Sequence, residues 1–117
     1  MRKQIVVNLV EYPIDLDMYV YSQWQEAKGS KFSELGDKLK EASETTAMIL
    51  LMELAYYGVR EACAESGIEF SLTEREFIKS LSLEEATNAV GIVLKAIQPE
   101  MVKENKRQQV SKPNRKA

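Results

Sequence analysis

The fold is decided by residues 47–57, which read AMILLMELAYY and are apolar at every position except Glu53. A surface helix shows one apolar stripe, whereas a helix that is apolar nearly all round must be covered on several sides. We therefore expect a central helix over Thr46–Cys63. Along it, Thr46, Glu53 and Arg60 recur every seven residues and predict a narrow polar stripe that faces solvent. Glu53 and Arg60 are two turns apart, about 10 Å by the helical rise, so no direct ion pair is expected.

The length and composition are typical of one globular domain. The chain has 117 residues, of which 44% are apolar and 29% charged. We expect residues 1–102 to form this domain. The longest apolar run, Ala47–Met52, is far shorter than the roughly 20 residues of a membrane span. Asn8 and Glu11 interrupt the apolar segment after the basic N-terminus, so no secretory signal is expected, and the single cysteine, Cys63, agrees with the cytoplasm.

A basic tail follows an acidic body. Residues 103–117 carry six basic side chains against one acid, Glu104, which gives +5; the whole chain carries −2, so the preceding residues sum to −7. Clustered Lys and Arg can bind nucleic acid by releasing counterions from phosphate. The tail has no aromatic residue to stack on bases and no periodic apolar face. We expect a disordered terminus without nucleic-acid binding, and binding through the tail stays the alternative.

The N-terminus predicts a β-hairpin over residues 4–16. Residues 4–10 are rich in β-branched side chains, which favour strands. In residues 12–16, apolar side chains alternate with Pro13 and Asp15, the period of a strand with one buried face. Because Pro13 cannot donate to a ladder, this second strand is expected to be short or at an edge. We expect the connection within residues 8–11, although it contains no Asn-Gly or Asp-Gly pair.

About five helices are expected to follow over residues 17–102 and to pack around the central one. Asp17 is a suitable N-cap for a helix over residues 18–28, and Gly29 is placed to end it. The residues expected on its buried face are Val20, Tyr21, Trp24 and Ala27. We expect Trp24 to anchor the core, with stacking on a ligand as the alternative. Residues 30–40 predict a short helix that packs on the core through Phe32, Leu35 and Leu39.

Several helix boundaries can be read from the sequence. Ser43 is a candidate cap for the central helix, and Ser66-Gly67 is placed to end it. Residues 73–76, TERE, have the spacing of a capping box, and residues 82–85, SLEE, repeat it. The last helix then follows a 3-4 apolar spacing to Ile97, with Pro99 at its expected end. Gly91 is expected to allow close approach to the central helix.

The residues that most enzymes use are missing from the chain. It contains no histidine, no Gly-rich phosphate loop and no cysteine spacing for a metal. The acidic pairs near residues 74–76 and 84–85 are explained by helix N-termini, where carboxylates are favourable. We therefore expect no catalytic, cofactor-binding or metal-binding residues, and a protein that is not an enzyme.

Methionine and tyrosine are prominent instead, and such side chains can repack against different partners. We expect part of the surface near five residues to contact a partner protein or another copy of the chain. These residues are Tyr19, Tyr21, Met52, Tyr56 and Tyr57. The alternative, that these side chains fill the core, stays open.

The order of parts resembles the small tail assembly chaperones of long-tailed bacteriophages, including those encoded by prophages. The resemblance spans residues 4–98 and rests on four stretches: YPIDLDM at 12–18, QEAKG at 25–29, the apolar helix at 47–57, and FSLTE at 70–74. It is one of pattern and element order, without an invariant motif. Family members often have a glycine-containing turn before the Tyr-Pro segment, where this chain has residues 8–11, NLVE.

The resemblance implies a non-enzymatic protein that acts in the cytoplasm of the bacterial host during virion morphogenesis. It would bind the tape measure protein, keep it soluble and help recruit tail tube subunits around it. In many members a frameshifted product carries a C-terminal extension, and the basic tail from Lys103 lies where it would begin. Two alternatives stay open: a small regulatory or nucleic-acid-binding protein that uses the tail, and a structural phage subunit.

Overall fold

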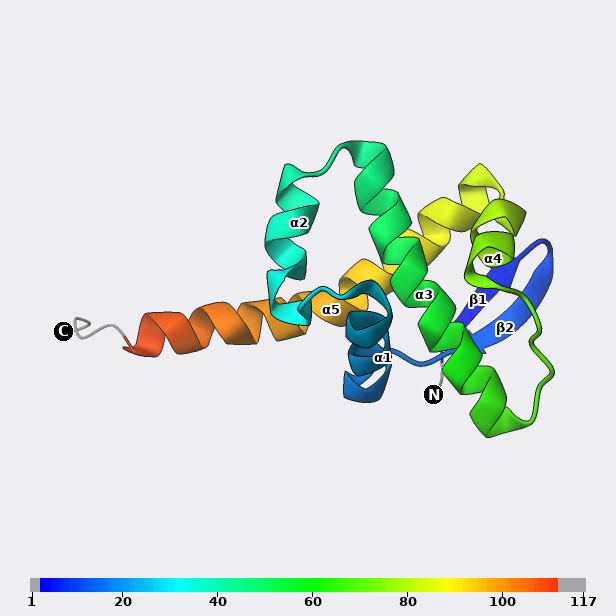
Figure 1. Ribbon diagram of the computed structural model, residues 1–117, viewed down its shortest axis with the longest axis horizontal. Coiled ribbons are helices and arrows are strands. Elements are labelled where there is room, and N and C mark those ends of the chain that lie inside the picture. The colour runs from blue at the N-terminus through cyan, green and yellow to red at the C-terminus, as the bar shows by residue number, and fades with distance from the viewer. Residues whose placement is uncertain (1–2, 112–117) are drawn as a thin grey trace.

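The chain folds as an N-terminal hairpin followed by helices that surround a central one (Figure 1). The computed structural model describes residues 3–111, with side-chain surroundings for residues 3–98. The described elements are β1 (Lys3–Val7), β2 (Val10–Ile14), α1 (Met18–Lys28), a 3-10 turn η1 (Phe32–Glu34), α2 (Leu35–Glu41), α3 (Glu44–Ser66), α4 (Glu74–Ser80) and α5 (Leu83–Ser111). The predicted class, mostly helical α+β with a short hairpin, is confirmed.

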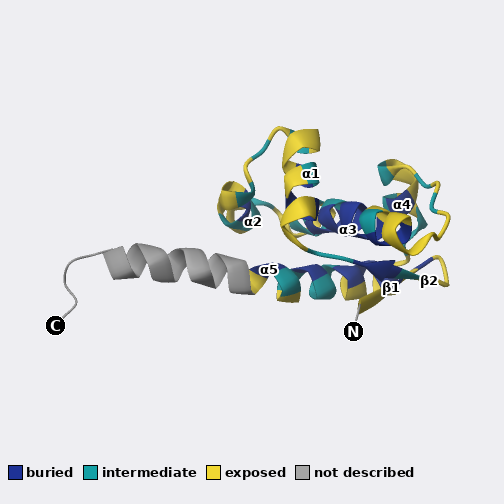
Figure 2. Ribbon diagram, turned by 90° about the horizontal axis from the view of Figure 1, so that it is seen from below, coloured by how far each residue is buried: buried dark blue, intermediate teal, exposed yellow. Residues whose placement is uncertain are grey.

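Helix α3 is the centre of the fold, as the apolar run at residues 47–57 predicts. It contacts α1, α2, α4, α5 and β2. Its burial is uneven: residues 44–50 are partly or fully exposed, whereas nearly every residue from Leu51 to Cys63 is buried. Figure 2 shows this buried stretch of α3 between α4 and the hairpin with α5. The largest fully buried side chains on α3 and around it include Trp24, Leu35, Leu54, Phe77 and Ile97.

The hairpin turn is tighter than expected. Asn8 and Leu9 both have positive φ, 52° and 67°, as a two-residue type I′ turn requires. Val7 therefore pairs with Val10, so β1 ends earlier and β2 begins earlier than predicted. A leucine in this conformation is uncommon. The amides of Asn8 and Leu9 donate to the carboxylate of a distant residue, described below, which holds the turn in place.

The hairpin crosses α3 at Gly58, where the two backbones touch. The Asp15 amide donates to the Gly58 carbonyl oxygen at 3.1 Å. A Cβ atom at Gly58 would collide with the Asp15 carbonyl oxygen and lie 2.9 Å from Cγ1 of Ile14. We expected this role for Gly91, which was wrong, because a Cβ atom there would meet nothing within 4 Å.

The predicted helix boundaries are mostly confirmed. Asp17 accepts from the Val20 amide, Ser43 accepts from the Thr46 amide, and Thr73 forms a capping box with Glu76. Gly29 and Gly67 end α1 and α3 in the left-handed conformation. The segment 30–40 forms η1 and α2, which pack on the core through Leu35. On α1, Val20, Tyr21 and Trp24 are buried, but Ala27 is exposed, so the prediction was wrong at this residue.

Helix α5 is longer than expected. It continues past Pro99, the predicted end, to Ser111. Residues 100–111 contain no glycine and consist largely of good helix formers such as Glu, Lys, Arg and Gln, which explains the continuation. The helix thus includes residues 103–111 of the basic tail, for which we expected disorder. Residues 112–117 lie outside the described part of the chain.

Candidate functional site

The five predicted interface residues do not form one exposed surface. Tyr19 is 59% exposed, whereas Tyr21, Met52, Tyr56 and Tyr57 are each at most 7% exposed. The ring of Tyr21 stacks on Phe32 with centroids 4.3 Å apart. The hydroxyl of Tyr56 donates to the Leu72 carbonyl oxygen at 3.1 Å. For these four residues the alternative of core packing is the one that the structure has, and only Tyr19 remains available to a partner.

A charged cluster joins α1, α3 and α4. Lys28 Nζ lies 2.6 Å from Glu74 Oε2 and 3.5 Å from Glu53 Oε2. The Tyr57 hydroxyl donates to Glu74 Oε1 at 3.2 Å. Glu53 is therefore part of an internal contact between helices, and its side chain is only 16% exposed. The predicted solvent-facing stripe was wrong at this residue, because the end of α1 covers it.

Burial and partners shift the pKa values in this cluster. Burial raises the pKa of Glu53 and outweighs the opposing charge of Lys28. Burial would lower the pKa of Lys28, but the hydrogen bond to Glu74 and the charges of Glu53 and Glu74 together raise it. Burial and the Glu74 carboxylate raise the pKa of the Tyr57 hydroxyl. These shifts follow from packing between helices, and every group has an internal partner, so the cluster is best explained as a structural contact.

Trp24 and Arg60 complete this side of the molecule. Trp24 is fully buried, which confirms its predicted role as a core anchor. Its indole nitrogen has no hydrogen bond of full geometry among the described residues, but it lies close enough to Glu53 to favour the carboxylate. Arg60 lies over the ring of Tyr57 at 4.8 Å and does not pair with Glu53 in the described structure. The side chains of Trp24 and Tyr57 therefore serve contacts within the chain.

Glu85 connects the hairpin turn to the start of α5. Its Oε1 accepts from the amides of Asn8 and Ser82, at 2.9 and 3.1 Å, and its Oε2 accepts from the amide of Leu9 at 2.9 Å. These backbone donors lower the pKa of the Glu85 carboxyl. The bond to Ser82 is the predicted capping box. The two bonds that Glu85 accepts from the turn join residues 77 and 76 positions apart, so they could not be predicted from local sequence.

This connection brings the hairpin turn and the start of α5, which both carry exposed apolar side chains, next to each other. The amides of Asn8 and Ser82 share one carboxylate oxygen, so their backbones are no more than two hydrogen-bond lengths apart. Leu9 and Leu83 follow them directly and are 90% and 79% exposed. Val10, beside Leu9 on β2, is half exposed. We call Leu9, Val10 and Leu83 the tip surface. Sequence reasoning missed it, although a leucine within the predicted connection was a visible signal.

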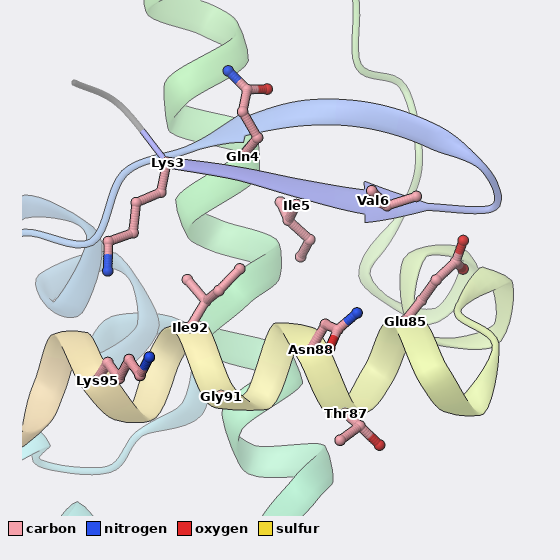
Figure 3. Close-up of a pocket in the computed structure, with 10 residues that line it drawn as sticks. All are labelled: Lys3, Gln4, Ile5, Val6, Glu85, Thr87, Asn88, Gly91, Ile92 and Lys95. Carbon is pink, nitrogen blue, oxygen red and sulfur yellow. The ribbon is translucent and has the colours of Figure 1, made fainter.

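A groove runs along β1 and α5 and has a volume of about 470 Å³. Its walls are residues 3–6 of β1 and, from α5, Glu85, Thr87, Asn88, Gly91, Ile92 and Lys95. Figure 3 shows that Lys3 and Lys95 lie at one end of the groove and that Glu85 lies at the other. Gly91 lies between them on α5 (Figure 3), and a Cβ atom there would meet nothing within 4 Å. None of these residues was predicted as a site.

Comparisons with protein-family models, with curated proteins and with solved structures give no match for this chain. Within the described residues, none of the helices combines the length and the apolar character needed to cross a bilayer. The same part of the chain holds no group of three or more histidine, cysteine, aspartate or glutamate side chains placed to bind a metal ion.

Proposed function

We propose that this chain is a non-enzymatic tail assembly chaperone of a long-tailed bacteriophage or prophage. In this role it acts in the bacterial cytoplasm, binds the tape measure protein and helps recruit tail tube subunits. The proposal rests on the resemblance of residues 4–98 to that family. The structural observation that carries it is the tip surface, where two leucines are almost fully exposed.

The tip surface has the properties that a protein-binding surface of a chaperone needs. Clustered exposed apolar side chains mark interaction sites, because burying them against a partner removes apolar area from water. The domain that carries them has a net charge of −7 before the basic tail, and such charge limits self-aggregation. Met18 and Tyr19, at the start of α1, are also more than half exposed and offer a second apolar contact.

Co-expression with the tape measure protein tests the proposal. We expect the wild-type chain to increase the soluble fraction of the tape measure protein and a double variant, Leu9→Asn with Leu83→Gln, to lose most of this effect. Asparagine tolerates the positive φ of residue 9, so the turn is retained. The control is Ile68→Gln, which removes an exposed apolar side chain just after α3. If the wild-type chain leaves the solubility of the client unchanged, the proposal is wrong.

The basic tail supports a second candidate function, a small regulatory or nucleic-acid-binding protein. Its charge of +5 contrasts with the acidic body. Such binding would weaken steeply with salt and would be abolished by truncation after Val102. Absence of DNA and RNA binding at low salt removes this candidate. A structural phage subunit, the third alternative, is distinguished by detection of the chain in purified virions.

A further inference from the structure

One edge of the hairpin is unpaired among the described residues and borders the groove. In an antiparallel ladder, a hydrogen-bonded pair exchanges both of its N–H···O bonds, and such pairs alternate with non-hydrogen-bonded pairs. Gln4 lies opposite Pro13, which has no N–H, so this is a non-hydrogen-bonded pair. By alternation, Val6 and Glu11 form the next one. The backbone N–H and C=O groups of Gln4 and Val6 therefore point away from β2.

These outward backbone groups lie along the groove. Four consecutive residues of β1, Lys3 to Val6, line it, as expected for a groove that follows the edge of a strand rather than one face. In the described structure the sheet has only β1 and β2, and no other segment bonds to the free edge. Unpaired strand edges are templates for adding a strand from another chain.

The opposite wall gives room for such a strand. Asn88, Gly91, Ile92 and Lys95 follow a spacing of three and four along α5, so they share one face of the helix. Gly91 has no side chain, and even a Cβ atom there would meet nothing within 4 Å. Ile92 is half-buried and offers an apolar contact beside this open space.

The charges at the two ends of the groove give it a direction. Lys3 and Lys95 lie at one end, and neither forms an ion pair with any other described residue (Figure 3). They form a local positive site on a body that is otherwise acidic. At the other end, the oxygens of Glu85 are already engaged by the turn and by Ser82. A bound segment is therefore expected to place its negative charge beside Lys3 and Lys95.

We propose that the groove binds an extended segment of a partner protein, which adds to β1 as an antiparallel strand with acidic residues at its C-terminal end. The orientation follows from the direction of β1, which runs from Lys3 toward the turn, and from the preference for antiparallel pairing. This site is separate from the tip surface and does not depend on the chaperone function. Backbone bonds to Gln4 and Val6 provide the pairing, and the two lysines select the acidic end.

A designed peptide tests this site on the full chain. The probe has eight residues, is acetylated, alternates valine with threonine and ends in two aspartates. We expect its addition to shift the NMR amide signals of Gln4 and Val6 and those of residues 87–95 on α5. We expect a control peptide with the two aspartates moved to the N-terminal end to bind at least tenfold more weakly. Equal binding of the two peptides would contradict the proposed orientation.

Two variants locate the binding within the groove. Gly91→Leu places a side chain in the open space and is expected to weaken binding of the probe at least tenfold. The helix is retained, because leucine favours helices. Ala64→Leu adds the same side chain at an exposed position of α3 and should leave binding unchanged. Lys95→Glu should also weaken binding tenfold and reduce its dependence on salt.

Three outcomes would overturn the proposal. The first is no amide shift with the probe in millimolar excess, and the second is unchanged affinity in Gly91→Leu. The third is a dimer of the probe-free chain, detected by sedimentation, that Gly91→Leu dissociates, since a second copy would then be the occupant of the groove. Loss of client binding in the Leu9 and Leu83 double variant tests the tip surface alone, so failure of either proposal leaves the other standing.

Discussion

The two sides of α3 differ in how far their polar groups and apolar side chains find contacts within the chain. On the side of α1 and α4, phenol hydroxyls and charged side chains find partners within the chain, as Tyr56, Tyr57, Lys28 and Glu74 do. On the side of the hairpin and α5, the backbone groups of one strand edge have no partner within the described part of the chain, and two leucines are exposed. We call these the closed side and the open side.

The closed side shows why aromatic content alone is a poor guide to binding. Phe70 lies in the segment between α3 and α4, and its ring contacts those of Tyr56, Phe77 and Tyr12 at centroid distances of 5.9, 6.2 and 5.4 Å. Each of these rings covers another, so their apolar area is removed from water within the chain. The capacity for further contacts lies instead where backbone geometry leaves groups unpaired.

The largest expected effect is on the closed side. Phe77 is fully buried and contacts the rings of Tyr56 and Phe70. Phe77→Ala is expected to lower the free energy of unfolding by about 3–5 kcal/mol, because it removes a large buried side chain and leaves a cavity. Urea denaturation measures this change. The matched variant on the open side, Leu83→Ala, should change it by less than about 0.5 kcal/mol. Similar losses in both variants would contradict the division into two sides.

Two glycines within helices offer the next comparison. Gly58 lies against the Asp15 backbone, so Gly58→Ala must displace β2 and is expected to cost about 2 kcal/mol despite the better helix propensity of alanine. Gly91 borders open space, so Gly91→Ala is expected to stabilise the chain by about 1 kcal/mol. Thermal unfolding of the two variants measures the difference. Stabilisation by Gly58→Ala would show that the hairpin does not press on α3.

Local patterns predicted the helices because their causes are local. The run at 47–57 gives α3, and the caps at Asp17, Thr73 and Ser82 act within three residues. The contacts of the open side are not local. Glu85 was predicted as part of a cap, but its bonds to Asn8 and Leu9 depend on how the hairpin packs against α5. The apolar content likewise predicts that Tyr56 and Tyr57 are buried. It does not show whether α4 and the segment before it bury them or whether a partner protein does.

Disrupting the charged cluster is expected to have a smaller effect on the stability of the closed side. Lys28→Met removes the cation between Glu53 and Glu74 and is expected to cost about 1 kcal/mol at neutral pH, since the pair is partly exposed. The cost should decrease at high salt, because ions screen the repulsion between the remaining carboxylates. Urea denaturation at two salt concentrations measures it. Lys31→Met, at an exposed lysine without a partner among the described ion pairs, serves as the control.

The smallest expected effects are in the pH dependence of stability, and they have opposite signs on the two sides. The pKa of Glu85 is lowered in the folded chain by its backbone donors. Its contribution to stability is therefore fully present above the unfolded pKa of about 4.3 and is lost as the pH falls through the folded pKa. The pKa of Glu53 is raised by burial. Stability is accordingly lost at this residue as the pH rises from about 4.3 through its folded pKa.

Glutamine substitutions separate these two contributions. Glu85→Gln should be less stable than the wild type at pH 7, and the difference should shrink toward pH 3, because the wild type then loses the charge that the variant lacks. The stability of Glu53→Gln relative to that of the wild type should be higher at pH 7 than at pH 3. Glu84→Gln removes an exposed carboxylate next to Glu85 that makes no hydrogen bond to the hairpin in the described structure, so it controls for net charge. Urea denaturation across this range measures all three differences. Equal pH dependence in Glu85→Gln and Glu84→Gln would mean that the carboxylate of Glu85 does not hold the turn, and that the tip surface is ordered by packing alone.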